Sequence, residues 1–271
     1  MSVELVGVLN ITPDSIHDAG MYLDPEKAAI KAEELFATGA SIVDIGGAAT
    51  NPGAHKISPE EELDRIETLV SLLLPLRPDY SYSIDTYHPE IVDRLARYGR
   101  FIVNDVTTFI NPDMIDVAAW YELPVIASHM PLVAEGDFEY AHELFMGPEE
   151  TRAELMEQRS KMIAGGIAEE NIILDPGLGF GKLMQANWEL LGIVNKYTEH
   201  LEGAWMLGPS EKRMLEYTTE GLPKKGADKK DEAANRAVVG QIIRSHKLSK
   251  RRLLLRVHNP GLYQDLLPQT P

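Results

Sequence analysis

The sequence predicts one (β/α)8 barrel that spans residues 1–271 as a single domain. Short apolar runs rich in β-branched residues alternate with longer stretches of helical character, as expected for βαβ units around a parallel sheet. Eight such units in a chain of this length favour a closed barrel over an open doubly wound sheet. An apolar fraction of 44% is enough for one sizeable core and argues against global disorder.

Each expected strand except the last is followed by its own helix. The strands are expected at residues 4–10, 41–47, 82–86, 101–106, 123–129, 171–177, 203–208 and 253–259. The helices are expected at 25–38, 59–74, 89–98, 114–120, 149–164, 186–197 and 231–245, and a short segment follows the last strand. Pro25, Pro59 and Pro89 mark helix starts, because the first turn has no partner for the N–H that proline lacks. Ser58 and Glu61 form a capping-box pattern at the second of these helices.

The charge balance excludes several classes of function. A formal net charge of −16 disfavours binding to nucleic acid or to an anionic membrane. The absence of cysteine excludes disulfides and thiolate metal sites and is compatible with the cytoplasm. The N-terminus lacks the pattern of a signal peptide, and no run approaches about 18 apolar residues. We therefore expect a cytoplasmic protein that acts on small molecules, without nucleic-acid or membrane partners.

Hydrogen-bonding or ionisable residues stand at or just after the end of every expected strand. They are Asn10, Asp44, Asp85, Asn104, Asp105, His129, Asp175, Ser210, Lys212, Arg256, His258 and Asn259. In a barrel these ends meet at one face, so the side chains are expected around a single cavity. Each residue alone has a structural alternative as a helix cap or turn residue. A whole ring of buried polar groups without partners would be costly, and the ring therefore predicts a polar ligand.

Seven segments resemble motifs of the dihydropteroate synthase family and follow that family's order. They are residues 7–15, 44–53, 83–86, 104–106, 175–182, 210–212 and 256–258. The resemblance extends from the first expected strand to the eighth. It implies a transferase of folate biosynthesis that condenses 6-hydroxymethyl-7,8-dihydropterin diphosphate with p-aminobenzoate and releases pyrophosphate.

The resemblance also implies which residues act. The pterin ring would be bound by Asp85, Asn104, Asp175 and Lys212, of which Asp85, Asp175 and Lys212 would be catalytic. The diphosphate would be bound by Asn10, Thr50, Arg256 and His258, with Asn10 also holding Mg²⁺. The p-aminobenzoate would be bound by Pro52, Phe180, Ser210 and Lys212. The family further implies a homodimer.

Four positions depart from the family's usual pattern. They are Ile16 in place of phenylalanine, Asn51 and Glu211 in place of arginine, and Asn259 in place of aspartate. The first two lie where sulfonamide mimics of p-aminobenzoate would bind, so altered sulfonamide sensitivity is expected. Two alternatives stay open: a pterin-binding paralogue without synthase activity, and a methyltetrahydrofolate-type methyltransferase that shares this barrel. Arg256, His258 and Lys182 favour a diphosphate site and so count against the methyltransferase.

Overall fold

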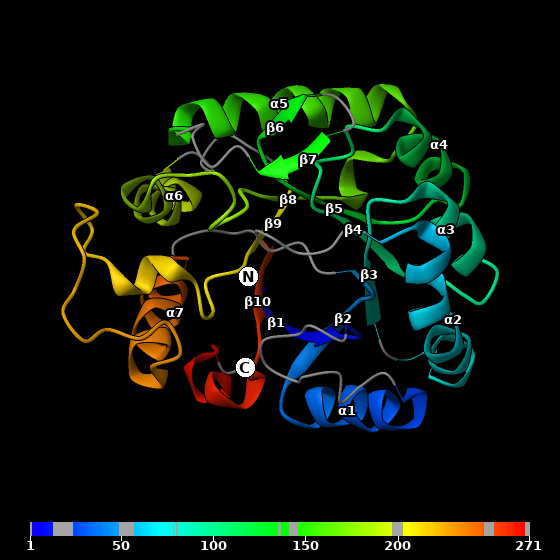
Figure 1. The fold of residues 1–271 in the computed structure, drawn as a ribbon, viewed down its shortest axis with the longest axis horizontal. Coiled ribbons are helices and arrows are strands. Elements are labelled where there is room, and N and C mark those ends of the chain that lie inside the picture. Colours follow the sequence, from blue (N-terminus) through cyan, green and yellow to red (C-terminus); the bar gives the residue numbers. More distant parts are fainter. Residues whose placement is uncertain are drawn as a thin grey trace.

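A computed structural model describes residues 2–12, 24–48, 57–77, 79, 81–134, 137–140, 146–196, 203–246 and 252–268. Eight parallel strands form a closed barrel in the order β1-β10-β9-β8-β5-β4-β3-β2. The helices make an outer ring around these strands (Figure 1). The predicted (β/α)8 barrel is confirmed. Within the described part of the chain, no helix has both the length and the apolar character that crossing a membrane requires.

All eight expected strands are present, within a few residues of the predicted bounds. They are β1 Ser2–Asn10, β2 Ala40–Gly46, β3 Ser81–Asp85, β4 Ile102–Asp105, β5 Val125–Ser128, β8 Ile172–Asp175, β9 Ala204–Leu207 and β10 Arg252–Val257. An antiparallel hairpin of β6 Leu132–Ala134 and β7 Asp137–Tyr140 was not predicted. It follows β5, so a small sheet of its own lies between that strand and the next helix of the barrel.

Seven α-helices are described, each between consecutive barrel strands. They are α1 Pro25–Ala37, α2 Pro59–Leu76, α3 Pro89–Leu95, α4 Pro112–Trp120, α5 Pro148–Ala164, α6 Met184–Lys196 and α7 Glu232–His246. Four 3-10 helices are also described: η1 Glu169–Asn171, η3 Arg213–Glu216, η4 Pro260–Leu262 and η5 Gln264–Leu266. The short segment expected after the last strand is thus a pair of 3-10 turns.

Side-chain caps explain where the early helices begin. The Asp24 carboxylate accepts a hydrogen bond from the Glu26 N–H at 3.0 Å, just before α1. The Ser58 hydroxyl oxygen accepts one from the Glu61 N–H at 3.2 Å, as the capping-box pattern predicts. Each bond satisfies an N–H that has no partner within the helix. Proline at the next position continues both helices without losing a hydrogen bond.

An apolar layer fills the barrel interior. It consists of Val6, Ile42, Ile102, Ile126, Ile173, Met206 and Leu254, each from a different strand and each at most 8% exposed. Alternate residues of a strand share a face, so the residue two positions further along also points into the barrel. Those next residues include Asp44, Asn104, Ser128, Asp175 and Arg256. A polar ring therefore stands directly above an apolar floor.

The apolar floor is expected to contribute strongly to stability. Ile126 is fully buried within it. Ile126→Ala should lower the free energy of unfolding by about 2–5 kcal/mol, because the closed barrel has little freedom to collapse around the cavity. Denaturant unfolding of the purified variant measures this change.

Ile30→Ala is the matched control, because Ile30 lies on α1 and is 61% exposed. Its effect should stay within about 0.5 kcal/mol. Equal losses for the two variants would contradict the view that the floor is tightly packed.

Candidate active site

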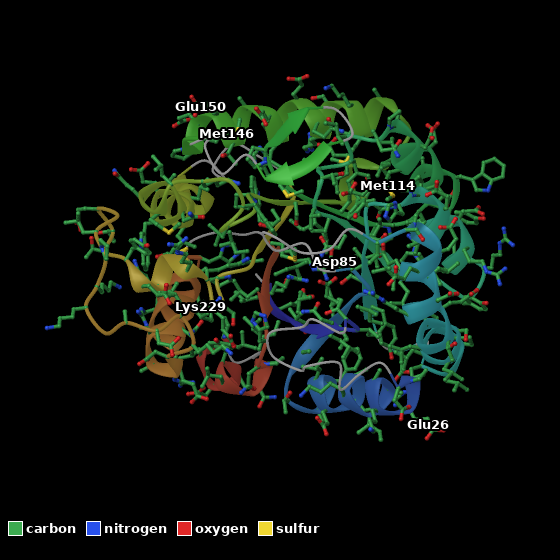
Figure 2. All side chains as sticks on the ribbon, viewed as in Figure 1. Glu26, Asp85, Met114, Met146, Glu150 and Lys229 are labelled. Atoms are coloured by element: carbon green, nitrogen blue, oxygen red, sulfur yellow. The ribbon has the colours of Figure 1, made fainter. Side chains whose placement is uncertain are left out.

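A cavity opens at the carboxyl ends of the strands. Its walls are Asp85, Asn104, Val106, Ser128, Asp175, Gly177, Leu178, Phe180, Gly208, Lys212 and Arg256. These residues come from six strands or the loops that follow them, and Asp85 lies near the centre of the ring of helices (Figure 2). The four residues expected around one heterocycle, Asp85, Asn104, Asp175 and Lys212, thus face the same space.

Arg256 joins two carboxylates within this polar ring. Its Nε donates to Asp44 Oδ2 at 2.6 Å, and its Nη2 donates to Asp85 Oδ2 at 2.8 Å. Asp44 also accepts from Ser83 Oγ at 2.5 Å and from the Asn104 amide at 3.2 and 3.3 Å. Buried ion pairs of this kind stabilise a fold only when further hydrogen bonds satisfy the charged groups, and Asp44 meets that condition. Asp44 therefore fixes the orientation of both Arg256 and Asn104.

Asp175 is held at both carboxylate oxygens. Oδ1 accepts from the Gly177 N–H at 2.8 Å, and Oδ2 lies 3.3 Å from the Ser128 hydroxyl. Ser128 Oγ is also 3.4 Å from Asn104 Oδ1. Ser128 was missed as a site residue, because the fifth expected strand was taken to end at His129. Its position two residues after the inward-facing Ile126 was the available signal.

Burial shifts the pKa values of the ionisable groups around the cavity. Desolvation raises the pKa of Asp85 to about 7, and Asp44 and Asp105 add to this while Arg256 opposes it. Desolvation also raises the pKa of Asp175 and lowers that of Lys212 to about 8. Arg256 adds to the shift at Lys212, whereas the two aspartates counteract it. The cavity therefore holds one acid, Asp85, and one base, Lys212, whose pKa values lie near neutral pH.

Some of the residues expected to bind the aromatic amine are among those that the structure describes. Lys212 Nζ lies 5.0 Å from the centroid of the Phe180 ring, and both side chains line the cavity. Ser210 is buried beside them, with its Oγ 3.2 Å from His258 Nδ1. Pro52, like Thr50 on the diphosphate side and the departures Ile16 and Asn51, lies outside the described residues.

The carboxylate of Glu211 stands where the family usually has an arginine. It lies 4.0 Å from His258 Nδ1. Glu211 has a φ of +56°, a conformation that non-glycine residues seldom adopt. Its N–H donates to Asn235 Oδ1 at 2.7 Å, and Asn235 Nδ2 donates to the carbonyls of Lys229 and Asp231. Asn235 therefore holds the turn that carries Lys212 into the cavity. Asn259 precedes η4 and does not line the cavity.

Two expected ring members, Asp105 and His129, have other surroundings, and so does Lys182. Asp105 accepts from the Thr107 N–H, the Thr107 hydroxyl and the Phe109 N–H, so it caps the turn after β4. His129 turns its ring toward Lys182 and Glu154. Lys182 was expected to favour an anion site, but its ammonium is buried against backbone carbonyls and does not line the cavity. None of these three side chains lines the cavity.

Asn10 lies at the mouth of the barrel. A methyl group on Gly46 would be 3.4 Å from Asn10 Oδ1 and 3.5 Å from Asp85 Cβ, so the Asn10 amide is close to Asp85. Among the described residues, no group of three or more His, Cys, Asp or Glu side chains is arranged to hold a metal ion.

Comparison with known proteins decides the family. A family model described as pterin binding enzyme matches residues 6–258. Dihydropteroate synthase of Escherichia coli strain K12 is 34% identical over 214 residues, which cover 78% of this chain and 74% of that protein. The chain belongs to the dihydropteroate synthase family. It is accordingly a transferase of folate synthesis.

Further relatives agree with this family. A Halobacterium salinarum protein named probable bifunctional folylpolyglutamate synthase/dihydropteroate synthase is 36% identical over 211 residues, or 78% of this chain, and the chain spans only 25% of its length. The structure of Yersinia pestis dihydropteroate synthase with a sulfonamide drug superposes with a TM-score of 0.80 at 28% identity, covering 97% of this chain and 91% of that one. The Xanthomonas albilineans synthase with 4-aminobenzoic acid gives 0.77 at 28%, covering 97% and 89%.

The shifted pKa values predict a narrow pH optimum for this transferase. The catalytic role that the family resemblance implies for Asp85 needs its ionised form, so kcat/KM is expected to fall as pH drops below about 7. Lys212 loses its charge as pH rises above about 8, and kcat/KM should fall again. Because the groups interact, the two limbs report apparent pKa values of the whole site.

The measurement is a pH profile of kcat/KM for the enzyme and for Asp85→Asn. The variant should be slower and should lack the acidic limb. An acidic limb that persists unchanged in Asp85→Asn would assign it to a different group.

Proposed function

We propose that this chain condenses 6-hydroxymethyl-7,8-dihydropterin diphosphate with p-aminobenzoate and releases pyrophosphate. The observation that carries the proposal is the convergence of Asp85, Asn104, Asp175, Lys212 and Arg256 on one cavity from separate strand ends. In the overall reaction the amine nitrogen forms a bond to the pterin methylene carbon, the C–O bond to the diphosphate breaks, and pyrophosphate leaves with that electron pair. The amine loses one proton.

The pterin ring would lie among Asp85, Asn104, Asp175 and Lys212. A pterin edge offers N–H donors and ring acceptors side by side. A carboxylate such as Asp175 accepts from the donors, and the Asn104 amide can donate and accept. Analogues without these groups would leave buried polar atoms unpaired, which is how such a site gains specificity. Asp85 would stabilise the positive charge that develops on the pterin as the diphosphate departs.

The diphosphate would lie toward Asn10, Arg256 and His258, with Thr50 as a further proposed contact. Arg256 uses Nε and Nη2 in its pairs with Asp44 and Asp85, so Nη1 remains to donate to a phosphate oxygen. His258 follows β10 two residues after Arg256, and its Nδ1 lies 3.2 Å from Ser210 Oγ. Donors placed here would stabilise the negative charge of the leaving group.

Mg²⁺ would be held by Asn10 together with diphosphate oxygens and water. An amide oxygen is a suitable ligand, and Mg²⁺ normally keeps several waters and binds substrate phosphates. When bound, the ion would draw negative charge from the leaving group.

The aromatic amine would enter between Phe180 and Lys212, beside Ser210 and Pro52. Phe180 offers an aromatic face, and Lys212 offers a cation near the ring. The related Xanthomonas albilineans structure contains 4-aminobenzoic acid. We further propose a cytoplasmic homodimer, on the family resemblance alone.

A pyrophosphate-release assay with pterin diphosphate and p-aminobenzoate tests the function. Turnover that requires both substrates supports the synthase. Pterin binding without turnover would instead support a paralogue without synthase activity. Absence of pterin binding would refute the proposed site altogether.

Arg256→Gln tests the proposed diphosphate contact. The variant should bind pterin diphosphate at least about tenfold more weakly, because a hydrogen bond from a charged donor contributes about 1.5–3 kcal/mol. Binding of 6-hydroxymethylpterin, which lacks the diphosphate, should weaken less. Calorimetric titration of both ligands measures the difference. Equal losses would show that Arg256 acts only through Asp44 and Asp85.

The predicted sulfonamide response can be tested by restoring the family's usual residues. The double variant Ile16→Phe, Asn51→Arg should differ from the unchanged enzyme in its sulfonamide inhibition constant, because both positions are expected beside the amine. Inhibition is measured in competition with p-aminobenzoate. Identical inhibition constants would remove the basis for this prediction.

A further inference from the structure

The loop after β8 forms part of the cavity wall. Residues 177–182 follow Asp175, and the loop presents Leu178 and Phe180 to the cavity. Gly177, Gly179 and Gly181 all have positive φ values of +66°, +87° and +54°. A backbone with so many glycines loses much freedom when it becomes ordered. An ordered conformation of this loop therefore requires stabilising contacts.

The buried ammonium of Lys182 closes the loop on itself. Lys182 is 6% exposed, and its Nζ lies 3.0 Å from the Phe180 carbonyl oxygen and 3.1 Å from that of Gly177. It also lies 3.3 Å from the carbonyl oxygen and 3.1 Å from the Nδ1 of His129, just beyond β5. A lysine Nζ carries several N–H donors, so one side chain ties both ends of the glycine turn to a neighbouring strand end.

His129 and Glu154 complete this arrangement from the outside. His129 is buried, and its Nε2 lies 3.0 Å from Glu154 Oε2 on α5. The carboxylate favours the tautomer that carries the proton on Nε2, which leaves Nδ1 free to accept from Lys182. Glu154 is 52% exposed and supplies a negative charge that balances the ammonium. The lysine is thus oriented by a chain that reaches the surface.

Asp175 shares one contact with this loop, because its Oδ1 accepts from the Gly177 N–H at 2.8 Å, but its other contacts come from the barrel. It pairs with Ser128 in the β5–β8 register, and its carbonyl accepts from the His129 N–H at 2.9 Å. These are backbone contacts of the barrel and do not involve the Lys182 side chain. Loss of the ammonium should therefore release Phe180 while leaving Asp175 in place. Effects on the Phe180 side of the cavity can therefore be measured separately from effects on the Asp175 side.

We propose that Lys182, oriented by His129 and Glu154, is a positioning residue for the aromatic-amine subsite. It holds the glycine turn so that Phe180 packs beside Lys212, 5.0 Å from its Nζ. Lys182 itself does not line the cavity. The inference rests on the proposed function, because it assigns Phe180 to the amine.

Lys182→Met tests the inference, since methionine fills similar space without donors. The KM for p-aminobenzoate should rise by about tenfold or more, as expected when charge-assisted hydrogen bonds are lost. The dissociation constant for the pterin, measured by titration, should change by less than about twofold, because Asp175 keeps its contacts. Lys224→Met is the matched control: this lysine donates to one carbonyl, that of Leu215, and should leave both constants unchanged.

Glu154→Leu provides a milder variant at a half-exposed position. It should raise the KM for the amine in the same direction, by about threefold, and it decides the question if Lys182→Met does not fold. Amide hydrogen exchange gives a readout without turnover: residues 179–181 should exchange faster in either variant, and residues 172–175 should not.

The outcomes separate this inference from the proposed function. If the unchanged enzyme makes no product, the function fails, and the exchange data alone decide whether Lys182 holds the loop. If the unchanged enzyme is active but both variants keep its KM for the amine, the inference is overturned. Equal losses for pterin and amine would also overturn it.

Discussion

The pairing of Arg256 with Asp44 and Asp85 is the interaction on which the cavity depends. Three carboxylates, Asp44, Asp85 and Asp175, stand above an apolar floor that offers them no solvation. One guanidinium bridges two of them, and Asn104 and Ser83 share the remaining hydrogen bonds of Asp44. Without that cation the ring would hold several buried negative charges, which a protein interior tolerates poorly. The cavity is thus preorganised by its own charges before any ligand enters.

The fold was predictable because one physical pattern repeats along the chain. Apolar runs followed by helical stretches located all eight barrel strands, and proline, together with Ser58 at one helix, located helix starts. The hairpin β6–β7 was not predictable in the same way, since it belongs to a connection and is not part of the βα repeat. The segment after β10 was recognised as short, but its 3-10 geometry depends on local turns at Pro260 and beyond that hydrophobic periodicity does not encode.

The residue types around the cavity were predictable from the sequence, whereas the directions of several side chains were not. Asp85, Asn104, Asp175 and Lys212 were grouped correctly around one cavity because strand ends converge. His129 and Lys182 carry equally suitable chemistry, yet both face away from the cavity and support its wall. The alternation of side chains along a strand distinguishes Ser128 from His129. Ser128 lies on the same face as the inward-facing Ile126, and His129 lies on the opposite face. The orientation of a loop residue such as Lys182 has no comparable rule and emerges only from the packed structure.

The alternation between floor and ring also limits how such a barrel can change over time. Insertion or deletion of a single residue within a strand such as β8 would exchange its inward and outward sets, turning Asp175 toward the helices and Leu174 into the cavity. Substitutions can therefore accumulate one at a time in the ring, whereas length variation is confined to the connections. New substrate preferences in this architecture should arise mainly by exchange of side chains and by loops of different length, with the strand registers left untouched.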